Sequence, residues 1–157
     1  MALTKINNNT LSSAGIATGR VLQVKQVTSS SNQTVTATSY TAITFFSVAI
    51  TPSATSSKIL ISCTTGVRNT TADKSNYLTL YRDSTNLGTV TAQGFGTLRV
   101  NATVYSGNVT FSFLDTPSST SQLHYEAYVK RNAGSGNLYL NYNSGATSTI
   151  TAMEVGA

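Results

Sequence analysis

The sequence predicts an all-β protein, and three observations support this fold class. Thr, Val, Ile, Tyr and Phe, which suit the pleated surface of a sheet, recur along the chain with an alternation of apolar and polar residues. No window places apolar residues at spacings of three and four, as an amphipathic helix would. Turn-forming residues separate the short hydrophobic runs, a pattern typical of a sandwich or barrel.

About ten short strands follow from this alternation. We expect them at residues 21–27, 40–51, 58–65, 77–82, 87–92, 98–105, 109–114, 122–130, 137–142 and 148–155. Gly, Asn, Asp and Ser gather between the runs and predict turns at 82–86, 106–108, 132–136 and 143–145.

The phrase Thr-Pro-Ser-x-Thr-Ser occurs twice, at residues 51–56 and 116–121, each time after the end of a predicted strand. Pro52 and Pro117 fix φ and remove a backbone donor, and the small hydroxyl residues can turn the backbone by local hydrogen bonds. We interpret both copies as corners. Strands that cross between two sheets need the same corner twice, so the near-repeat indicates one Greek-key or jelly-roll domain.

The first nineteen residues differ from the rest, because their Asn, Ser and Gly leave little to bury. We expect an extended N-terminal docking arm at 1–19 and a β-sandwich domain at 20–157. The arm packs against its own domain or a neighbour, and its apolar candidates for virion docking are Leu3, Ile6, Leu11 and Ile16. The start lacks the basic and apolar regions of a secretory signal. Since the longest apolar stretch, 42–50, is far shorter than the ~20 residues of a membrane helix, we expect a soluble chain without membrane insertion.

Neutral polar residues dominate the composition. The 157 residues include 27 Thr, 21 Ser and 13 Asn, whereas charged residues make up only 10%. The formal charge is +5, but the basic residues are scattered, and only Lys130 and Arg131 are adjacent. A nucleic-acid-binding surface needs a basic stripe, so we expect no nucleic-acid partner. Extracellular and virion β-proteins often have such a hydroxyl-rich surface.

The residues that could carry catalysis are few. His124 is the only histidine, and alternation places it with Glu126 on one strand face, where the pair could bind metal or move protons. A surface or interface hydrogen bond is the favoured interpretation, because no second His or Cys completes a site. Cys63, the single cysteine, cannot form an internal disulfide. We therefore expect no enzyme activity, no metal and no cofactor.

Four tyrosines lie opposite leucines or share the His124 face: Tyr77, Tyr81, Tyr128 and Tyr139. If the leucines fill the core, these tyrosines form an outer aromatic set, which suits a subunit interface or a carbohydrate platform. The subunit interface is the favoured interpretation, and the carbohydrate platform is the alternative. In the last strand the apolar residues shift from one face to the other, so we expect it in the middle of a sheet that also faces a partner. The candidate interface residues are Tyr77, Tyr81, Tyr128 and Met153.

Loops rich in Asn, Ser, Gly and Tyr could serve host-surface adhesion, because this mixture is found in recognition loops, and the candidates are residues 68–76, 82–86 and 130–137. The same residues are also ordinary turn formers. The candidate ligand-loop residues are Arg68, Asn69, Asp73, Asn76, Arg82, Asn86, Arg131 and Asn132.

Several phrases together resemble a known family: GRVLQVKQV, ITPSATSSKILIS, YLTLYRDSTNLG, DTPSSTSQLHYEAYVK and STITAMEV. Over residues 19–155 the chain is similar to virion structural proteins of marine bacteriophages of the tail-fibre or fibre-like family. The resemblance implies a jelly-roll sandwich of the tumour-necrosis-factor type, a homotrimer, and a place on the virion surface after assembly in the host cytoplasm.

Fibre proteins usually carry a long shaft, whereas this chain has only the short arm. Three roles therefore stay open: a distal tip held by another protein, a short spike, and a decoration on the capsid. The predicted function is a virion surface protein of fibre or spike type that serves host attachment, with a host surface glycan as the possible ligand. Capsid decoration, as a head fibre with a purely architectural role, is the alternative.

Overall fold

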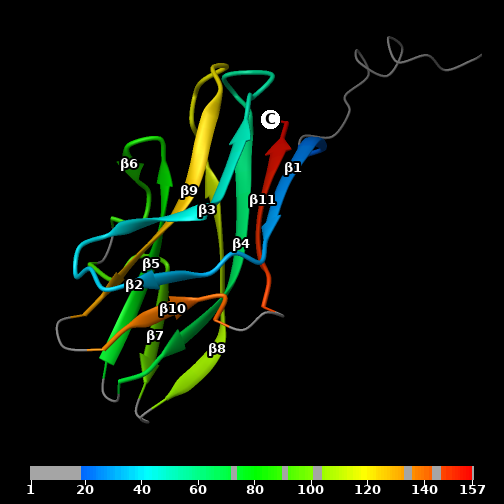
Figure 1. The fold of residues 1–157 in the computed structure, drawn as a ribbon. Helices are drawn as coiled ribbons and strands as arrows, with labels where there is room; N and C mark the ends of the chain where they lie inside the picture. Colours follow the sequence, from blue (N-terminus) through cyan, green and yellow to red (C-terminus); the bar gives the residue numbers. More distant parts are fainter. Residues whose placement is uncertain are drawn as a thin grey trace, which may run out of the picture.

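The computed structural model describes residues 19–71, 74–89, 92–100, 104–132, 136–142 and 146–156. They form two antiparallel sheets that pack face to face (Figure 1). The strands are β1 (Val21–Ser29), β2 (Gln33–Val35), β3 (Thr41–Ile50), β4 (Lys58–Asn69), β5 (Lys74–Arg82), β6 (Thr85–Asn86), β7 (Gly96–Val100), β8 (Tyr105–Asp115), β9 (Leu123–Arg131), β10 (Leu138–Leu140) and β11 (Ser148–Val155).

The strand order is that of a jelly roll. In the first sheet β1 pairs with β11, β11 with β4, and β4 with β8. The short β10 also pairs with β4, on the same edge as β11, and β2 pairs with β10. In the second sheet the order is β3, β9, β5, with β6 and β7 on β5. The other eight strands, numbered again in chain order without the short β2, β6 and β10, have the order one, eight, three, six in the first sheet. Their order in the second sheet is two, seven, four, five. This order confirms the predicted all-β jelly-roll sandwich.

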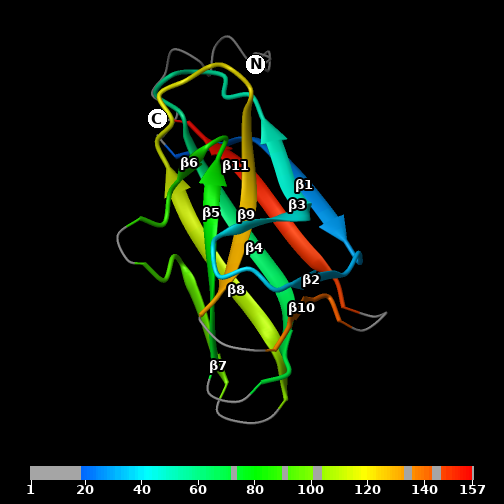
Figure 2. The ribbon, with the colours of Figure 1, turned by 60° about the vertical axis from the view of Figure 1, so that its left-hand side comes forward.

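Both Thr-Pro-Ser phrases are corners between the sheets, as predicted. The first links β3 to β4, and the second returns from β8 to β9. They lie at the same end of the sandwich, because Ile50 pairs with Leu123 on one sheet and Ile59 pairs with Asp115 on the other (Figure 2). The repeated phrase therefore reflects two crossings in opposite directions.

The core lies between the sheets and is aliphatic and aromatic. Leu78, Leu80, Leu138 and Leu140 are fully buried, so the condition set for the outer tyrosines, that these leucines fill the core, is met. Along β9 the buried face is Leu123, Tyr125, Ala127 and Val129, and it alternates with the face of His124 and Glu126. Burial of this apolar surface is the main stabilising contribution in such a domain.

Several details of the predicted elements were wrong. Residues 87–89 form a turn and not the start of a strand, since the segment folds back onto β5 through Leu87 N donating to Leu80 O. The described residues of the predicted strand 98–105 divide between the end of β7 in the second sheet and the start of β8 in the first. The predicted turn 106–108 is extended strand, because β4 supplies hydrogen-bonding partners along its whole length. The strand β2 was missed, since only three residues of a polar stretch form it.

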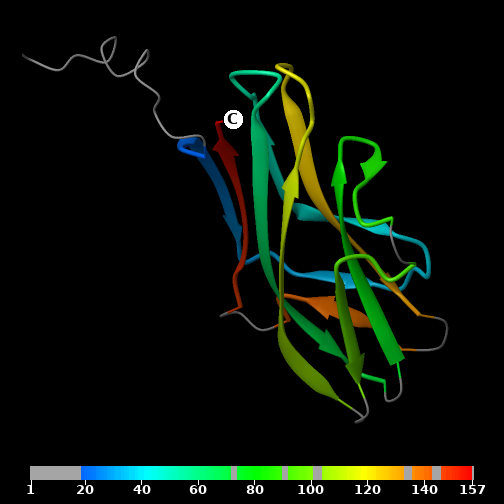
Figure 3. The ribbon, with the colours of Figure 1, turned by 180° about the vertical axis from the view of Figure 1, so that it is seen from behind.

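The last strand has the bounds that the sequence predicted and lies between β1 and β4. The residues just before β1 and just after β11 are hydrogen-bonded to each other: Gly19 N donates to Gly156 O at 2.8 Å, and Gly156 N donates to Arg20 O at 2.9 Å. Figure 3 shows β1 and β11 side by side from behind. The arm candidates Leu3, Ile6, Leu11 and Ile16 lie outside the described residues, so the arm stays a prediction.

Candidate functional site

A pocket of about 260 Å³ opens on the outer face of the first sheet, where β4 ends and β8 begins. In Figure 1 this is the lower end of the sandwich. The lining residues are Gly66, Val67, Arg68, Ser106, Gly107, Asn108, Tyr142 and Ala146. The register pairs Gly66 with Asn108 and Arg68 with Ser106, so two neighbouring strands supply most of the lining.

Glycine at position 66 leaves the middle of this pocket open. A Cβ at Gly66 would lie 3.4 Å from the Ala146 Cβ, 3.6 Å from Asn108 Oδ1 and 3.7 Å from Asn141 Oδ1, which are ordinary contacts. A Cβ would therefore fit at this position, and it would take up room in the pocket. A glycine inside a strand often marks a close approach by another group.

Arg68 and Tyr142 form the polar and aromatic side of the pocket. The Arg68 guanidinium carbon lies 3.9 Å from the centre of the Tyr142 ring, and the Tyr139 ring meets Tyr142 edge-on at 5.0 Å. Such stacking holds the planar guanidinium in one orientation. The Arg68 Nε atom is buried and has no hydrogen-bond partner among the described residues. Among all described residues the one ion pair joins Arg82 to Asp115, away from the pocket. No described carboxylate therefore neutralises Arg68.

The backbone before Tyr142 is held by a buried hydrogen-bond network. Asn141 has φ of 50°, a left-handed conformation that Asn tolerates, and its N donates to Gly66 O at 2.9 Å. Its side-chain amide donates to Ser29 O and Ser31 O at 3.1 and 3.0 Å. The Ser148 hydroxyl donates to Asn141 Oδ1 at 2.8 Å. This turn fixes the point from which the Tyr142 side chain extends over Arg68.

Beyond the pocket, the outer face of the first sheet is uncharged over three rows of cross-strand neighbours. An apolar row crosses four strands through the pairs Val24–Met153, Met153–Leu60 and Leu60–Leu114. Val24 is 53% exposed and Leu114 48% exposed. The next two rows consist of Gln26, Thr151, Ser62 and Ser112, and of Thr28, Thr149, Thr64 and Thr110. We call the first row the apolar row.

The outer face of the second sheet carries three of the four predicted tyrosines, Tyr77, Tyr81 and Tyr128. The Tyr81 and Tyr128 rings stack at 3.9 Å between centroids. The Lys130 ammonium lies 4.5 Å from the Tyr40 ring centre and 5.5 Å from that of Tyr77. These rings therefore already contact one another or a cation within the chain. Burial is the main cause that raises the pKa of Tyr128, followed by the nearby Glu126 carboxylate.

The candidate interface residues do not form one patch. Tyr77, Tyr81 and Tyr128 lie on the outer face of the second sheet, whereas Met153 belongs to the apolar row on the first. Tyr139 lies on the first sheet too, beside the pocket. A head-to-tail contact closes into a ring only if its rotation closes, and patches on opposite faces of a sandwich favour an open stack.

Two of the candidate ligand-loop residues require correction. Asn69 and Asn76 lie inside β4 and β5 and are buried, because their strands extend beyond the predicted bounds. Asn69 Oδ1 accepts a hydrogen bond from Thr71 N at 3.0 Å. The Asn76 amide points inward and has no hydrogen-bond partner among the described residues. Neither side chain is available to a ligand at the surface.

The remaining loop candidates have different surroundings. Asn86 accepts hydrogen bonds from Thr79 Oγ1 at 2.7 Å and Gly88 N at 3.0 Å, and so forms part of a turn. Arg131 donates through Nε and a terminal nitrogen to Thr36 O. The Asn132 backbone N donates to Ser75 O. Asp73 lies outside the described residues. Of the seven candidates that the structure describes, only Arg68 lines the pocket.

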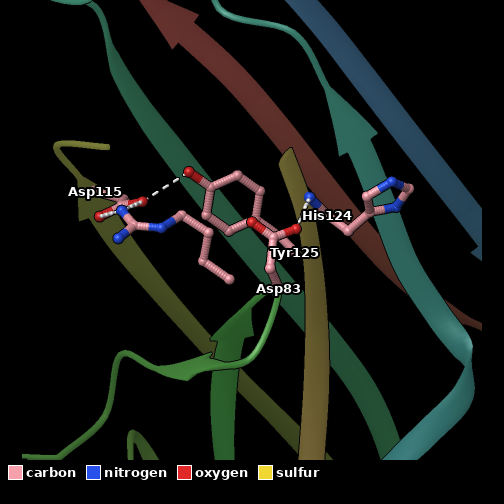
Figure 4. Close-up of polar contacts among 5 residues, drawn as sticks. Asp83, Asp115, His124 and Tyr125 are labelled. Carbon is pink, nitrogen blue, oxygen red and sulfur yellow. Dashed lines mark hydrogen bonds and ion pairs between the residues drawn. The ribbon is translucent and has the colours of Figure 1, made fainter. Parts of the chain in front are cut away.

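Arg82 belongs to a polar cluster at the corner end of the sandwich (Figure 4). Its Nη1 donates to both carboxylate oxygens of Asp115, at 2.9 and 2.7 Å, and the Tyr125 hydroxyl donates to Asp115 Oδ2 at 2.7 Å. Burial and then the Asp115 hydrogen bond raise the pKa of Tyr125, so its hydroxyl stays protonated. The cluster joins β5, β8 and β9 across the two sheets, and its role is structural.

His124 contributes little to this cluster. Its backbone N donates to Asp83 Oδ1 at 3.0 Å, while its imidazole is exposed and points away from Asp115 (Figure 4). Among the described residues no group of three or more His, Cys, Asp and Glu could hold a metal ion. Cys63 is buried in the core, and burial raises the pKa of its thiol to about 12. The described residues include no helix with the length and apolarity to span a membrane.

Sequence reasoning missed most of the pocket. Ser106, Gly107 and Asn108 were predicted as a turn, and Tyr142 was placed only in a strand. The useful signal was a glycine within each of two alternating runs, at Gly66 and Gly107, because a strand glycine often indicates a bulge or a close approach. That signal does not reveal that the two glycines lie on adjacent strands.

No protein-family model matches the sequence, and a comparison with curated proteins finds no match. Among solved structures the chain is similar to that of the infectious bursal disease virus Gx strain, with 17% identity and a TM-score of 0.46 over 89% of this chain. It is also similar to a mutant VP2 protein of the same virus, with 16% identity and a TM-score of 0.45 over 90%. The chain spans 38% and 37% of the length of these two proteins.

Proposed function

We propose that this chain is a virion surface protein of fibre or spike type whose jelly-roll domain binds a host surface. The observation that carries the binding role is the pocket at Arg68 and Tyr142, which is lined by a stacked guanidinium without a described carboxylate partner. The location on a phage particle rests on the family resemblance of the sequence phrases. The protein is not an enzyme and needs no cofactor or nucleic acid.

Assembly with further copies of the chain occurs through the apolar row in this proposal. A second copy suits this surface because the row and the two hydroxyl rows beside it contain no charged residue. Two copies of a protein with net charge +5 can approach there without bringing like charges into direct contact. The second sheet is less suited, since its outer face carries Lys130, Glu126 and His124. The expected oligomer is a homotrimer.

Capsid decoration is the second candidate function, and the same apolar row favours it. A row of exposed aliphatic side chains on one face can contact a capsid lattice as well as another copy. In that case residues 1–19 and the apolar row together hold the chain on the particle, and the pocket has no part in infection.

Density for the chain on intact phage particles, combined with an adsorption assay, tests these roles. Attachment of the chain to the tail, together with slower adsorption when purified chain is added in excess, supports host attachment. Attachment to the capsid lattice with unchanged adsorption supports decoration. Absence of the chain from purified particles overturns both.

A further inference from the structure

We propose that the pocket at Arg68 binds the carboxylate-bearing sugar of an acidic saccharide. This inference rests on the proposed attachment function and names its ligand class. Its first basis is charge. Arginine binds carboxylates through two parallel hydrogen bonds, and no described carboxylate pairs with the half-buried Arg68 side chain, which lines the pocket. An incoming carboxylate would pair with the terminal nitrogens of its guanidinium.

The second basis is that the guanidinium is held in place before a ligand arrives. Arg68 stacks on Tyr142 at 3.9 Å, and Tyr139 supports Tyr142 from the side at 5.0 Å. The Asn141 turn anchors the backbone of Tyr142 to the first sheet. A side chain that is already ordered loses less conformational entropy on binding, so a small ligand can bind with useful affinity.

The third basis is the rest of the lining. Ser106 and Asn108 present a hydroxyl and an amide beside Arg68, and these groups can donate to and accept from the hydroxyls of a sugar ring. Gly66 has no side chain that would stand between a ring and the sheet. A volume of about 260 Å³ is slightly below the ~300–1,000 Å³ of pockets for drug-sized ligands, which suits one ring and not a long chain.

An acidic peptide is the competing ligand, because an Asp or Glu side chain also offers a carboxylate to arginine. The sugar is favoured since Ser106 and Asn108 line the pocket beside Arg68, whereas a peptide carboxylate would use Arg68 alone. With a bound peptide, the Ser106 hydroxyl and the Asn108 amide would contribute nothing to the affinity. Both ligands enter the test.

Isothermal titration of the full chain with sialyllactose, with lactose as the neutral match, tests the proposal. We expect sialyllactose to bind and lactose to bind at least about tenfold more weakly, because a hydrogen bond to a charged group is worth about tenfold or more in affinity. A glutamate-rich peptide and inorganic phosphate serve as comparison probes. Equal binding of lactose, or tighter binding of the peptide or of phosphate, overturns the proposal.

Two variants and one control locate the site. Arg68→Gln removes the charge, and Gly66→Thr keeps the charge but fills the open position. Both should weaken sialyllactose binding about tenfold or more. Arg99→Gln removes an exposed arginine of β7 and should leave binding unchanged. Should Arg68→Gln fail to fold, Gly66→Thr decides alone, and unchanged binding by a folded Gly66→Thr variant overturns the assignment.

The same variants separate this inference from the proposed function. Particles that carry the Arg68→Gln chain and adsorb normally would overturn the pocket as the attachment site, while the virion role stands. A chain that binds sialyllactose but is absent from purified particles would overturn the virion role and leave the saccharide site.

Discussion

Glu154 holds Ser53 through two short hydrogen bonds: its Oε1 accepts from the Ser53 backbone N at 2.7 Å and from the Ser53 hydroxyl at 2.5 Å. Ser53 belongs to the first Thr-Pro-Ser corner, and Glu154 lies near the end of the last strand. The Gln23 amide donates to the other carboxylate oxygen at 2.6 Å and to Thr51 O at 2.7 Å. A fully buried carboxylate thus joins β1, β11 and the corner after β3.

This arrangement predicts acid sensitivity that depends on Glu154. Burial raises the pKa of the carboxyl, but the hydrogen bonds from Ser53 and Gln23 outweigh it and lower the pKa from 4.5 to about 2. The Ser57 hydroxyl is near enough to add to this lowering, although it lacks hydrogen-bond geometry. The depressed pKa stabilises the folded state above pH 4.5, and this contribution is lost as pH falls from about 4.5 to 2.

The measurement is the free energy of unfolding by denaturant at neutral pH and at pH 3. Glu154→Gln should lower it by ~3 kcal/mol at neutral pH, which corresponds to the change in pKa. The difference between wild type and variant should shrink as the pH approaches 2. A difference that is the same at both pH values would contradict the role of this carboxylate.

The Asp115 cluster predicts unequal effects of its members. Tyr125→Phe removes one hydrogen bond, and Asp115 keeps its pair with Arg82, so we expect a loss of ~1–2 kcal/mol in the free energy of unfolding. Asp115→Ala leaves a buried hydroxyl and a partly buried guanidinium without a partner and should cost ~3–5 kcal/mol. Tyr105→Phe is the matched control, because Tyr105 is 45% exposed. Equal losses for Tyr125→Phe and Tyr105→Phe would count against the cluster.

The apolar row predicts that one charge disrupts assembly without unfolding the domain. Leu114→Asp places a carboxylate among aliphatic side chains of a proposed interface, where burial without a partner is costly. Since Leu114 is 48% exposed, the monomer should remain folded. Light scattering should show a trimer for wild type and a monomer for the variant.

Val104→Asp is the control for that experiment, because Val104 is 50% exposed and precedes β8 at its far end. It should leave the mass of the assembly unchanged. A wild-type chain that is monomeric at micromolar concentration would exclude the proposed trimer.

Cys63 should be unreactive in the folded protein. It is fully buried, and with a pKa of about 12 almost none of its thiol is ionised at neutral pH. A thiol reagent should label it only after addition of denaturant, at a rate that follows unfolding. Rapid stoichiometric labelling under native conditions would show that the core around β4 is open to solvent.

Much of the fold could be predicted from local patterns. The alternation along β9 identified which residues point inward, and it gave β11 with the bounds that the structure has. The paired Thr-Pro-Ser phrases predicted two crossings between sheets, because proline and small hydroxyl residues limit the backbone in the same way wherever they occur. These features depend on neighbours in the chain, so the sequence alone determined them.

Only the tertiary structure decided which residues meet on a surface. Ser106, Gly107 and Asn108 have the composition of a turn, yet they are extended because β4 provides hydrogen-bonding partners beside them. Asn69 and Asn76 have the polarity of loop residues, yet they are buried because strand pairing continues past the hydrophobic runs. The pocket joins Arg68 of β4 to Tyr142, far along the chain, through a turn held by Asn141. Contacts of this kind depend on strand order and register, which are set by the packing of the whole sandwich and not by any local stretch of sequence.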